Sequence, residues 1–492
     1  MRIGLLRTAA VTAIAALAAT TLPLTAQAAP APAADPNALT VLRDQGIGSF
    51  ATGLSVGPEI GWNAGLTNAQ PPSATYYRIW DQKTAWRDIN PSRGEFNWDI
   101  LDARIDKVTN DWHGKPILVL GLTPEWAAAN PSAGTGTWGA GSASPPANMD
   151  DWSNYVAAVV QRYGGRIGAY EIWNEANLQT FWQGSVDQLV EMTKRASAII
   201  GQSAQVLAPS VTTRLPSGGK WTAAYATALG DANAGLIDGW AIHTYPAGNA
   251  GPTVQGACTA RVEGIDKWQN ALAAAVGPDS DFLRKSQWDT EINYGLAGPG
   301  ANPATDWSDF DGGMLLICTY NDSHWMGIDV TVWYEYTAEP FDLLGVQFTP
   351  TTQVVNGAWN AIATNIARDP KNPWIPTIAA TDSATDASSS ASDSSSTVSQ
   401  DDEQRSIRLR GKKKKGSSRY TFFVYGDTTG LAGKYLVAMA KTDPANDYVR
   451  GGTAWVDEGG TFTWTLATRA KSLWVFFKDP ESGVHSNRLK LK

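Results

Sequence analysis

The sequence predicts an α/β fold, a (β/α)8 TIM barrel that is followed by a Ser-rich linker and a small all-β sandwich domain. Three observations predict it. Eight short apolar runs alternate with helix-like stretches over about 330 residues, which is the size and rhythm of a barrel. The segment 381–400 then contains no large apolar residue except Val398. The runs after it are short and rich in β-branched and aromatic residues, which is typical of a sandwich.

The first residues have the pattern of a secretory signal peptide. Arg2 and Arg7 give a positively charged start, an Ala- and Leu-rich apolar stretch follows, and Ala-Gln-Ala at 26–28 fits the rule for cleavage after small residues. We therefore expect residues 1–28 to be removed and residues 29–44 to form an N-terminal lead. The mature protein is then expected to be secreted and extracellular.

The barrel is expected to span residues 45–375. Its candidate strands are SFATGLSV, ATYYRIWD, KPILVLGL, GAYEIWNE, AQVLAPSV, IDGWAIHTY, SQWDTEIN and DVTVWYEY. Between most of them lie helix-like segments, several with apolar residues at i, i+3 and i+4: 98–110, 150–163, 185–200, 221–229, 263–276 and 310–326. A doubly wound open sheet is the alternative. It is disfavoured for two reasons. No Gly-rich phosphate loop follows any strand, and the polar residues gather at the carboxyl ends of many strands rather than at one switch point.

The C-terminal part is expected to hold a flexible linker, 376–402, and the sandwich, 403–492. A segment as Ser-rich as 381–400 cannot offset the entropy of ordering. The sandwich strands are indicated by RYTFFVYGD, KYLVAMA, YVRGGTAWVDE, GTFTWTLAT and SLWVFFKD, which turn residues separate. Two roles stay open for this module, contact with a polysaccharide or cell wall and a simple spacer. The run Lys412–Lys415 is more typical of a solvated loop than of a contact with an anionic surface.

Charge is divided unevenly along the 492 residues, whose formal net charge is -8. From Asp401 to Lys492 there are 17 Lys plus Arg against 10 Asp plus Glu, which leaves -15 for the first 400 residues. An acidic barrel argues against nucleic acid as a partner, because a polyphosphate needs a basic groove. After the signal, no run of 18 or more uninterrupted apolar residues predicts a transmembrane segment.

Cys258 and Cys318 are the only thiols. In an oxidising exterior they could form a disulfide, or each could be buried as a free thiol, and the sequence leaves both open. Their spacing lacks the paired clusters of a zinc or redox site. We expect neither a metal nor an organic cofactor.

Polar and aromatic side chains gather where the candidate strands end. Because barrel enzymes build their sites at the carboxyl ends of the strands, we expect these side chains to surround one site. Glycosidic cleavage needs two carboxylic acids, one to protonate the leaving oxygen and one ionised to attack or stabilise the sugar. The candidates for the catalytic pair and for substrate binding are Arg78, Trp80, Trp126, Asn174, Glu175, His243, Tyr245, Glu291 and Trp333.

Two motifs resemble those of a known group of enzymes. WNEAN at 173–177 resembles the strand-4 Asn-Glu signature of clan A glycoside hydrolases, and WDTEINYG at 288–295 resembles their strand-7 nucleophile segment. An Arg on strand 2, IHTY on strand 6 and a Trp on strand 8 complete the pattern in the expected order. Within the clan, the segment 78–102 is most similar to family 39, the β-xylosidase and iduronidase group, and its relatives.

The resemblance implies a retaining double displacement. Glu175 would be the general acid/base and Glu291 the nucleophile. Arg78 and Tyr245 would hydrogen-bond Glu291, which would keep it ionised and aimed. Asn174 would hold the 2-hydroxyl of the sugar, a contact that strengthens in the transition state.

The resemblance also implies supporting roles for two further side chains, His243 and Trp333. His243 would lie near the acid/base, and Trp333 would form the floor under the reacting sugar. Trp80 and Trp126 are placed for stacking on sugar rings. Strand 3 leads into LGLTPEW, without the His that some clan members have there, which argues against a close analogy to family 5 cellulases. The long loop 130–150 could shape a sugar subsite or be a disordered insertion.

Other residues at the strand ends have ordinary structural explanations. Glu171 is expected to be a buried partner of a basic group. Asp289 lies two residues before Glu291, so we expect it to share that face of the strand and to be structural. Several tryptophans in helix-like segments are expected to pack in the core: Trp98, Trp152, Trp221 and Trp268.

The sequence therefore predicts a secreted retaining glycoside hydrolase that cleaves O-glycosidic bonds of an oligo- or polysaccharide. One alternative is a non-catalytic carbohydrate-binding or cell-wall-associated protein on the same barrel, and another is a family 5-like endo-glycanase. The presence of both Glu with their supporting Arg, Asn and Tyr favours an enzyme, because a binding protein could lose any of them. The sugar, its linkage and the choice between internal and terminal cleavage depend on loops.

Overall fold

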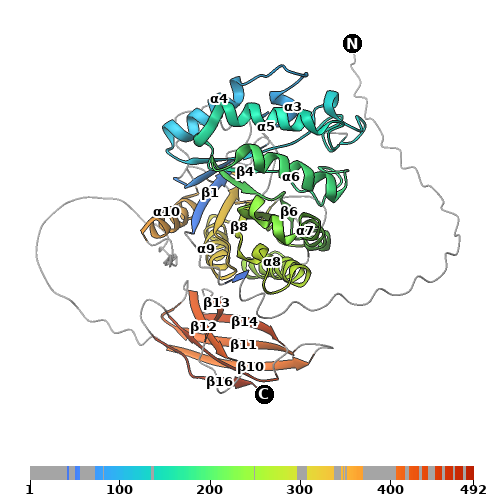
Figure 1. Cartoon of the computed structure of the whole chain (residues 1–492). Helices are drawn as coiled ribbons and strands as arrows, with labels where there is room; N and C mark the ends of the chain where they lie inside the picture. Colours follow the sequence, from blue (N-terminus) through green and yellow to red (C-terminus); the bar gives the residue numbers. More distant parts are fainter. Residues whose placement is uncertain are drawn as a thin grey trace, which may run out of the picture. The chain divides into compact units, whose positions relative to one another are not determined.

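The computed structural model describes most of the chain from Leu42 to Leu491 (Figure 1). The described residues are 42–43, 50–55, 73–80, 83–134, 138–248, 250–295, 307–336, 345–346, 348, 352–368, 406–415, 420–431, 435–441, 449–456, 460–468, 471–479 and 484–491. The predicted signal peptide, lead and linker lie outside these residues, apart from Leu42 and Arg43.

A closed barrel of parallel strands forms the first part, as predicted. The order is β5-β4-β3-β2-β1-β9-β8-β7-β6, and Leu207 of β5 pairs with Gly239 of β7, which closes the ring. The fifth barrel strand is split into β5 and the two-residue β6, and both pair with β7. The bounds are β1 Ala51–Ser55, β2 Tyr76–Ile79, β3 Lys115–Val119, β4 Ala169–Glu171, β5 Gln205–Leu207, β6 Val211–Thr212, β7 Gly239–His243, β8 Ser286–Ile292 and β9 Val330–Tyr334.

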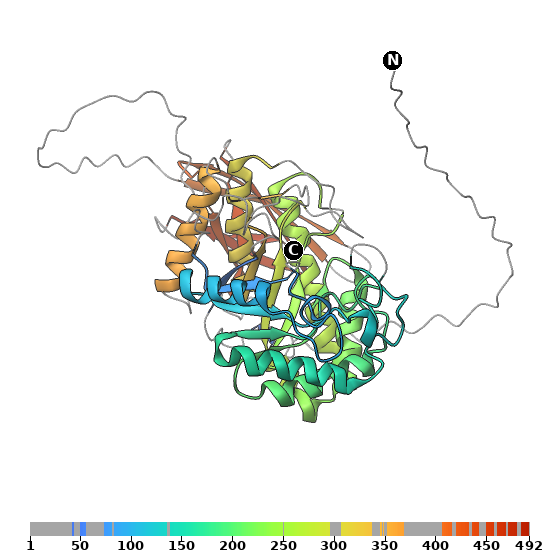
Figure 2. The ribbon, with the colours of Figure 1, turned by 90° about the horizontal axis from the view of Figure 1, so that it is seen from above.

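Helices lie around the outside of these strands in both views (Figures 1 and 2). The six predicted helical segments are present, although α8 begins nine residues before the predicted 263, and α10 had not been predicted. Their bounds are α3 Trp86–Ile89, α4 Asp99–Asp106 with a π-helical turn Lys107–Asp111, α5 Met149–Tyr163, α6 Val186–Ile200, α7 Pro216–Leu229, α8 Val254–Val276, α9 Asp309–Trp325 and α10 Gln353–Arg368. Short 3-10 turns occupy Glu125–Ala127, Gly164–Arg166, Asp231–Leu236 and Asp281–Arg284.

Local sequence signals account for both ends of α6. Ser185 and Gln188 form a reciprocal capping box at the start of α6, which satisfies two backbone N–H groups that the first turn leaves unpaired. Gly201 ends α6 at a φ of 54°, a conformation that costs glycine least. The apolar face of α6 is buried against the outside of the barrel.

Alternate side chains of the strands fill the interior of the barrel, and Trp288 is the largest of the buried side chains in this cluster. Trp288 of β8 packs there among small residues such as Ala169 and Ala241, and Tyr76 meets its ring edge-on at 4.8 Å. Gly53 lets β1 approach β9, because a Cβ at this position would lie 2.6 Å from a methyl group of Val332. This packed layer closes the barrel below the polar side chains of the opposite end.

The C-terminal part contains two antiparallel sheets around a shared apolar core, in agreement with the predicted all-β class. Their strand orders are β10-β11-β14 and β13-β12-β15-β16. The run of four lysines does not form a loop, since it ends strand β10. The bounds are β10 Ser406–Lys415, β11 Tyr420–Thr429, β12 Tyr435–Lys441, β13 Val449–Trp455, β14 Thr461–Thr468, β15 Leu473–Lys478 and β16 Leu489–Leu491.

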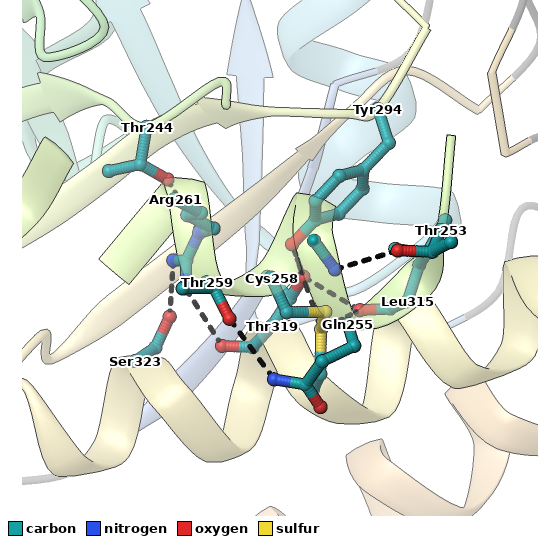
Figure 3. The surroundings of a disulfide bond; sticks show 12 residues. Thr244, Thr253, Gln255, Cys258, Thr259, Arg261, Tyr294, Leu315, Thr319 and Ser323 are labelled. Carbon is teal, nitrogen blue, oxygen red and sulfur yellow. Dashed lines mark hydrogen bonds between the residues drawn. A yellow bond between two sulfur atoms is a disulfide. The ribbon is translucent and has the colours of Figure 1, made fainter. Parts of the chain in front are cut away.

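A disulfide joins Cys258 of α8 to Cys318 of α9 (Figure 3), which decides between the two alternatives that the sequence left open. It links positions that are 60 residues apart. Such a link limits the freedom of the unfolded chain, because the strand and loops between the two helices become a closed ring.

Among the described residues, no helix is long and apolar enough to cross a membrane.

We predict that replacing both cysteines, Cys258→Ser with Cys318→Ser, lowers the free energy of unfolding by about 2 to 4 kcal/mol. Urea denaturation followed by tryptophan fluorescence measures this, with oxidised wild-type protein as the reference. Reduced wild-type protein should match the double variant. Equal stability of all three forms would contradict a disulfide in the folded protein.

Candidate active site

The carboxyl ends of β2, β4, β7 and β8 bring the polar candidates together inside the barrel. Arg78 comes from β2, Glu171 ends β4, His243 ends β7 and Glu291 lies one residue before the end of β8. All four are buried, with exposed fractions from 0 to 6%. Side chains from four separate strands therefore meet at one point, as the barrel prediction required.

Arg78 connects most of this group. Its Nε and Nη2 donate to the two carboxylate oxygens of Glu171 at 3.0 and 2.8 Å, and its Nη2 also donates to Oδ1 of Asn174 at 2.9 Å. Its Nη1 donates to Oε1 of Glu291 at 2.5 Å. One guanidinium thus holds a carboxylate from β4 and a carboxylate from β8, with an amide between them.

Glu171 has the structural part that was expected of it. Burial opposes ionisation of its carboxyl group, but the charge and hydrogen bonds of Arg78 outweigh burial, so the pKa of Glu171 lies below its ordinary value. The same pairing raises the pKa of Arg78 in spite of its burial. This pair therefore stays ionised and fixes the guanidinium that Glu291 needs.

Glu175 is held in an unusual backbone conformation. Its φ is 41°, in the left-handed region that non-glycine residues rarely adopt. Ser210, between β5 and β6, stabilises this turn because its Oγ accepts a hydrogen bond from the Glu175 N–H at 2.9 Å and its carbonyl accepts one from Ala176 at 2.8 Å. Strain of this kind is often found at functional sites. No pattern in the sequence identified Ser210 as part of the site.

A break in the strand pattern turns Glu291 into the barrel. Trp288 faces inward, so strict alternation would place Glu291 on the helix side. The register of β8 shifts against β7 and also against β9 in this part of the strand, and Glu291 then lies inside beside Arg78. The expectation that Asp289 shares its face is wrong for this reason, since Asp289 points to the helix layer and pairs with Arg261.

The two catalytic candidates lie close enough to act on one bond. One carboxylate oxygen of Glu175, one of Glu291 and a ring nitrogen of His243 all lie within 4.8 Å of one another. Nδ1 of His243 is 3.1 Å from Oε1 of Glu175 and 3.4 Å from Oε2 of Glu291. The position of His243 beside Glu175 is therefore as the resemblance implied.

Two neighbours respond to the negative charge in this group. Burial would lower the pKa of His243, but the charge of Glu291 and the hydrogen bond and charge of Glu175 raise it above its ordinary value. Burial, followed by the charges of Glu291 and Glu175, raises the pKa of Tyr245 well above its ordinary value. The Tyr245 hydroxyl therefore stays protonated and donates to Oε2 of Glu291 at 2.8 Å.

Arg261 of α8 supports the same strand ends from the helix side (Figure 3). Its Nε donates to Oγ1 of Thr244, between His243 and Tyr245, at 2.7 Å, and its Nη2 donates to Asp289 at 2.8 Å. Thr244 also donates its backbone N–H to Asp289, at 3.2 Å. The guanidinium additionally donates to two acceptors on α9, the Thr319 carbonyl and the Ser323 hydroxyl. The charge of Asp289 raises the pKa of Arg261, although burial opposes it.

This clamp, which consists of Arg261, Asp289 and Thr244, fixes β7 and β8 where their register shifts. It lies next to the disulfide, because Cys258 is one helical turn before Arg261 and Cys318 immediately precedes Thr319. The inward direction of Tyr245 and of the nucleophile candidate therefore depends on contacts made outside the barrel.

Aromatic side chains form one group beside the catalytic candidates. Trp80 and Trp138 lie 5.5 Å apart, and Phe181 lies 6.1 Å from Trp80. Trp138 comes from the long loop 130–150, in which residues 133–134 and 141–146 are buried, so the alternative of a disordered insertion does not hold for its described residues. We call this group the mouth aromatics; its members are Trp80, Trp138, Phe181, Tyr245 and Tyr334.

Trp126 and Trp333, which were predicted to stack on sugar rings, do not belong to the mouth aromatics. Trp126 packs edge-on against Trp86, and its Nε1 donates to the carbonyl of Asn90 at 2.9 Å. Trp333 is fully buried in the apolar layer between strands and helices, where its Nε1 donates to the Val346 carbonyl. Their contacts with a sugar stay predictions.

Two of the mouth aromatics, Tyr334 and Phe181, were not predicted from the sequence. Tyr334 follows the inward-facing Val330 and Val332 at intervals of two residues, so alternation along β9 could have identified it in place of Trp333. Phe181 lies in a loop and carries no comparable signal.

The group Glu175, His243 and Glu291 also has the donor atoms of a metal site. Arg78 and Tyr245 already bind both oxygens of Glu291, and a guanidinium at this distance repels a cation. The chemistry that the group can perform without a metal is proton transfer by one carboxyl group and nucleophilic attack by the other.

Comparison with known proteins agrees with the motifs. Residues 47–209 match the model of glycosyl hydrolases family 39. Over 127 residues the chain is 29% identical to a β-xylosidase of Geobacillus stearothermophilus, a match that covers 24% of this chain and 25% of that protein. The chain thus matches about a quarter of the length of this curated relative. The expected resemblance to family 39 is confirmed over the matched residues, which include Arg78 and Glu175 and end before Glu291.

Solved structures with some likeness include glycoside hydrolases. A family 39 glycoside hydrolase from the gut symbiont Bacteroides cellulosilyticus is 14% identical, with coverage of 87% of this chain and 80% of that chain and a TM-score of 0.42. An endo-1,4-β-xylanase of Penicillium canescens is 12% identical, with coverage of 66% and 98% and a TM-score of 0.42.

We predict that Arg261→Met lowers the free energy of unfolding by about 3 to 5 kcal/mol, because it leaves the Asp289 carboxylate buried without its guanidinium. The matched control is Arg162→Met, which removes the partly exposed pair with Asp102 and should cost less than about 1 kcal/mol. Urea denaturation measures both. Equal losses in the two variants would contradict the clamp.

Proposed function

We propose that this protein is a secreted, retaining glycoside hydrolase that cleaves O-glycosidic bonds by double displacement. The observation that supports this most strongly is the approach of the Glu175 and Glu291 oxygens to within 4.8 Å, with Glu291 bound by Arg78 and Tyr245. Retaining enzymes keep their two carboxyl groups about 5 to 5.5 Å apart, whereas inverting enzymes need about 6.5 Å or more to admit a water molecule.

In the first step Glu291 attacks the anomeric carbon and forms an ester bond to the sugar. The glycosidic C–O bond breaks, and Glu175 donates its proton to the leaving oxygen. Arg78 and Tyr245 aim the attacking carboxylate, since each binds one of its oxygens. His243 contacts Glu175 and so positions the proton donor.

In the second step Glu175 takes a proton from water, which attacks the same anomeric carbon. The ester bond to Glu291 breaks, and both carboxyl groups return to their starting forms. Two inversions at one carbon give net retention. Arg78 orients Asn174 through its amide oxygen, and the nitrogen of Asn174 would bind the 2-hydroxyl of the sugar.

For the substrate we propose a β-linked glycoside and take aryl β-xyloside as the first to test, because the curated relative is described as a β-xylosidase. The mouth aromatics would stack on its sugar rings. Aryl glucosides, galactosides and arabinosides, together with polysaccharides, complete the set of substrates.

We predict that Glu175→Gln and Glu291→Gln each reduce kcat/KM by at least about a thousandfold on the best substrate, because each removes one of the two carboxyl groups that the reaction needs. Glu125→Gln, an exposed carboxylate after β3, is the matched control and should keep nearly normal rates. A 2-fluoroglycoside of the same sugar should label Glu291, as peptide mass spectrometry would show. Near-normal rates in either catalytic variant, or no labelling of Glu291, would overturn the assignment.

We propose further that residues 1–28 direct export, on the strength of their charge and apolar pattern. A disulfide between Cys258 and Cys318 supports an oxidising compartment. The expected result of N-terminal sequencing of protein recovered from the culture medium is a chain that starts at Ala29. A chain that stays inside the cell with Met1 in place would contradict export.

A further inference from the structure

The outer side of one C-terminal sheet carries a row of aromatic and cationic side chains. Along β15, Leu473, Val475 and Phe477 are fully buried in the sandwich core, so the residues between them face the opposite side. We call this side the basic face. It consists of Lys441 on β12, Trp474, Phe476 and Lys478 on β15, and Arg488 and Lys490 at β16.

The strand register places these side chains next to one another. Trp474 lies between Lys441 of β12 and Lys490 of β16, each its direct partner across the sheet. The rings support the cations: Lys490 lies 4.8 Å from the ring centre of Trp474, and Arg488 lies 5.7 Å from that of Phe476. Cation–π contacts of this kind hold flexible cationic side chains in place.

The basic face carries four cations, and none of its described side chains is acidic. The outer side of the other sheet differs in composition, because it carries an acidic side chain, Asp427 of β11, which pairs with Arg410 of β10. Since ammonium and guanidinium groups cover the faces of Trp474 and Phe476, the rings serve as supports for charge rather than as open platforms for a neutral sugar. The ligand that complements such a surface is an extended polyanion.

We propose that the basic face binds a linear anionic polysaccharide, one whose sugars carry carboxylate groups. A carboxylate that meets Lys490 or Arg488 would meet a cation that an aromatic ring already holds, so little side-chain entropy is lost on binding there. The positive charge of the C-terminal residues complements such a polymer, whereas the acidic barrel would repel it. This inference does not depend on the proposed hydrolysis, because it concerns side chains of the C-terminal sheets alone.

Binding of the full-length protein to sodium polygalacturonate, measured by isothermal titration calorimetry at low salt, tests the proposal. The triple variant Lys441→Gln, Arg488→Gln, Lys490→Gln should bind at least about tenfold more weakly than wild type, and added salt should weaken wild-type binding. The matched control removes the same three charges from the outer side of the other sheet: Arg408→Gln, Arg410→Gln, Lys412→Gln. It should stay within about twofold of wild type.

Three results would overturn the proposal: an equal loss in both triple variants, equal binding of neutral xylan, or binding of phosphatidylglycerol vesicles or DNA without binding of polygalacturonate. Circular dichroism shows whether each variant is folded. If the triple variant is not folded, Lys490→Gln alone takes its place and is expected to weaken binding about threefold. Hydrolysis of a small aryl glycoside, followed in parallel, should be the same in all variants. A loss of binding is thereby distinguished from a failure of the proposed activity.

Discussion

The site depends on one buried charge, the guanidinium of Arg78, which two carboxylates share. A cation inside a barrel is tolerated only where anions and hydrogen-bond acceptors surround it. Glu171 provides the permanent partner from β4, so Arg78 stays charged and keeps one amino group directed at Glu291. Tyr245 binds the second oxygen of Glu291. The orientation of the proposed nucleophile therefore depends on the ion pair between Arg78 and Glu171. Glu171 itself takes no chemical part in the proposed reaction.

Both proposed catalytic carboxylates lie where the backbone departs from regular geometry. Glu175 has a positive φ that Ser210 stabilises, and Glu291 follows a register shift of β8. Arg261 fixes that shift from the helix layer, beside the disulfide. Irregular backbone at these two points turns both side chains toward one another, and the surrounding regular barrel provides the rigidity that offsets its cost.

The sequence predicted the class of the fold and the paired role of Glu171, and it named two acids that the structure brings close together, because buried strands and polar strand ends leave clear patterns. It failed where the strand period breaks. Alternation by two residues put Asp289 on the face of Glu291, which the register shift reverses. On β9 the alternation holds, and the inward position belongs to Tyr334, which was not predicted, while Trp333 lies in the apolar layer between strands and helices. Register shifts and loops depend on contacts between distant residues, which local pattern does not contain.

The close approach of Glu175 and Glu291 is the centre of the account, and the stereochemistry of the first product tests it most directly. Proton NMR during hydrolysis of an aryl β-xyloside, or of whichever aryl β-glycoside is cleaved best, shows which anomer of the free sugar forms before mutarotation. Two displacements at one carbon predict the β-anomer first. Initial release of the α-anomer would mean a single displacement by water and would contradict the proposed roles of both residues.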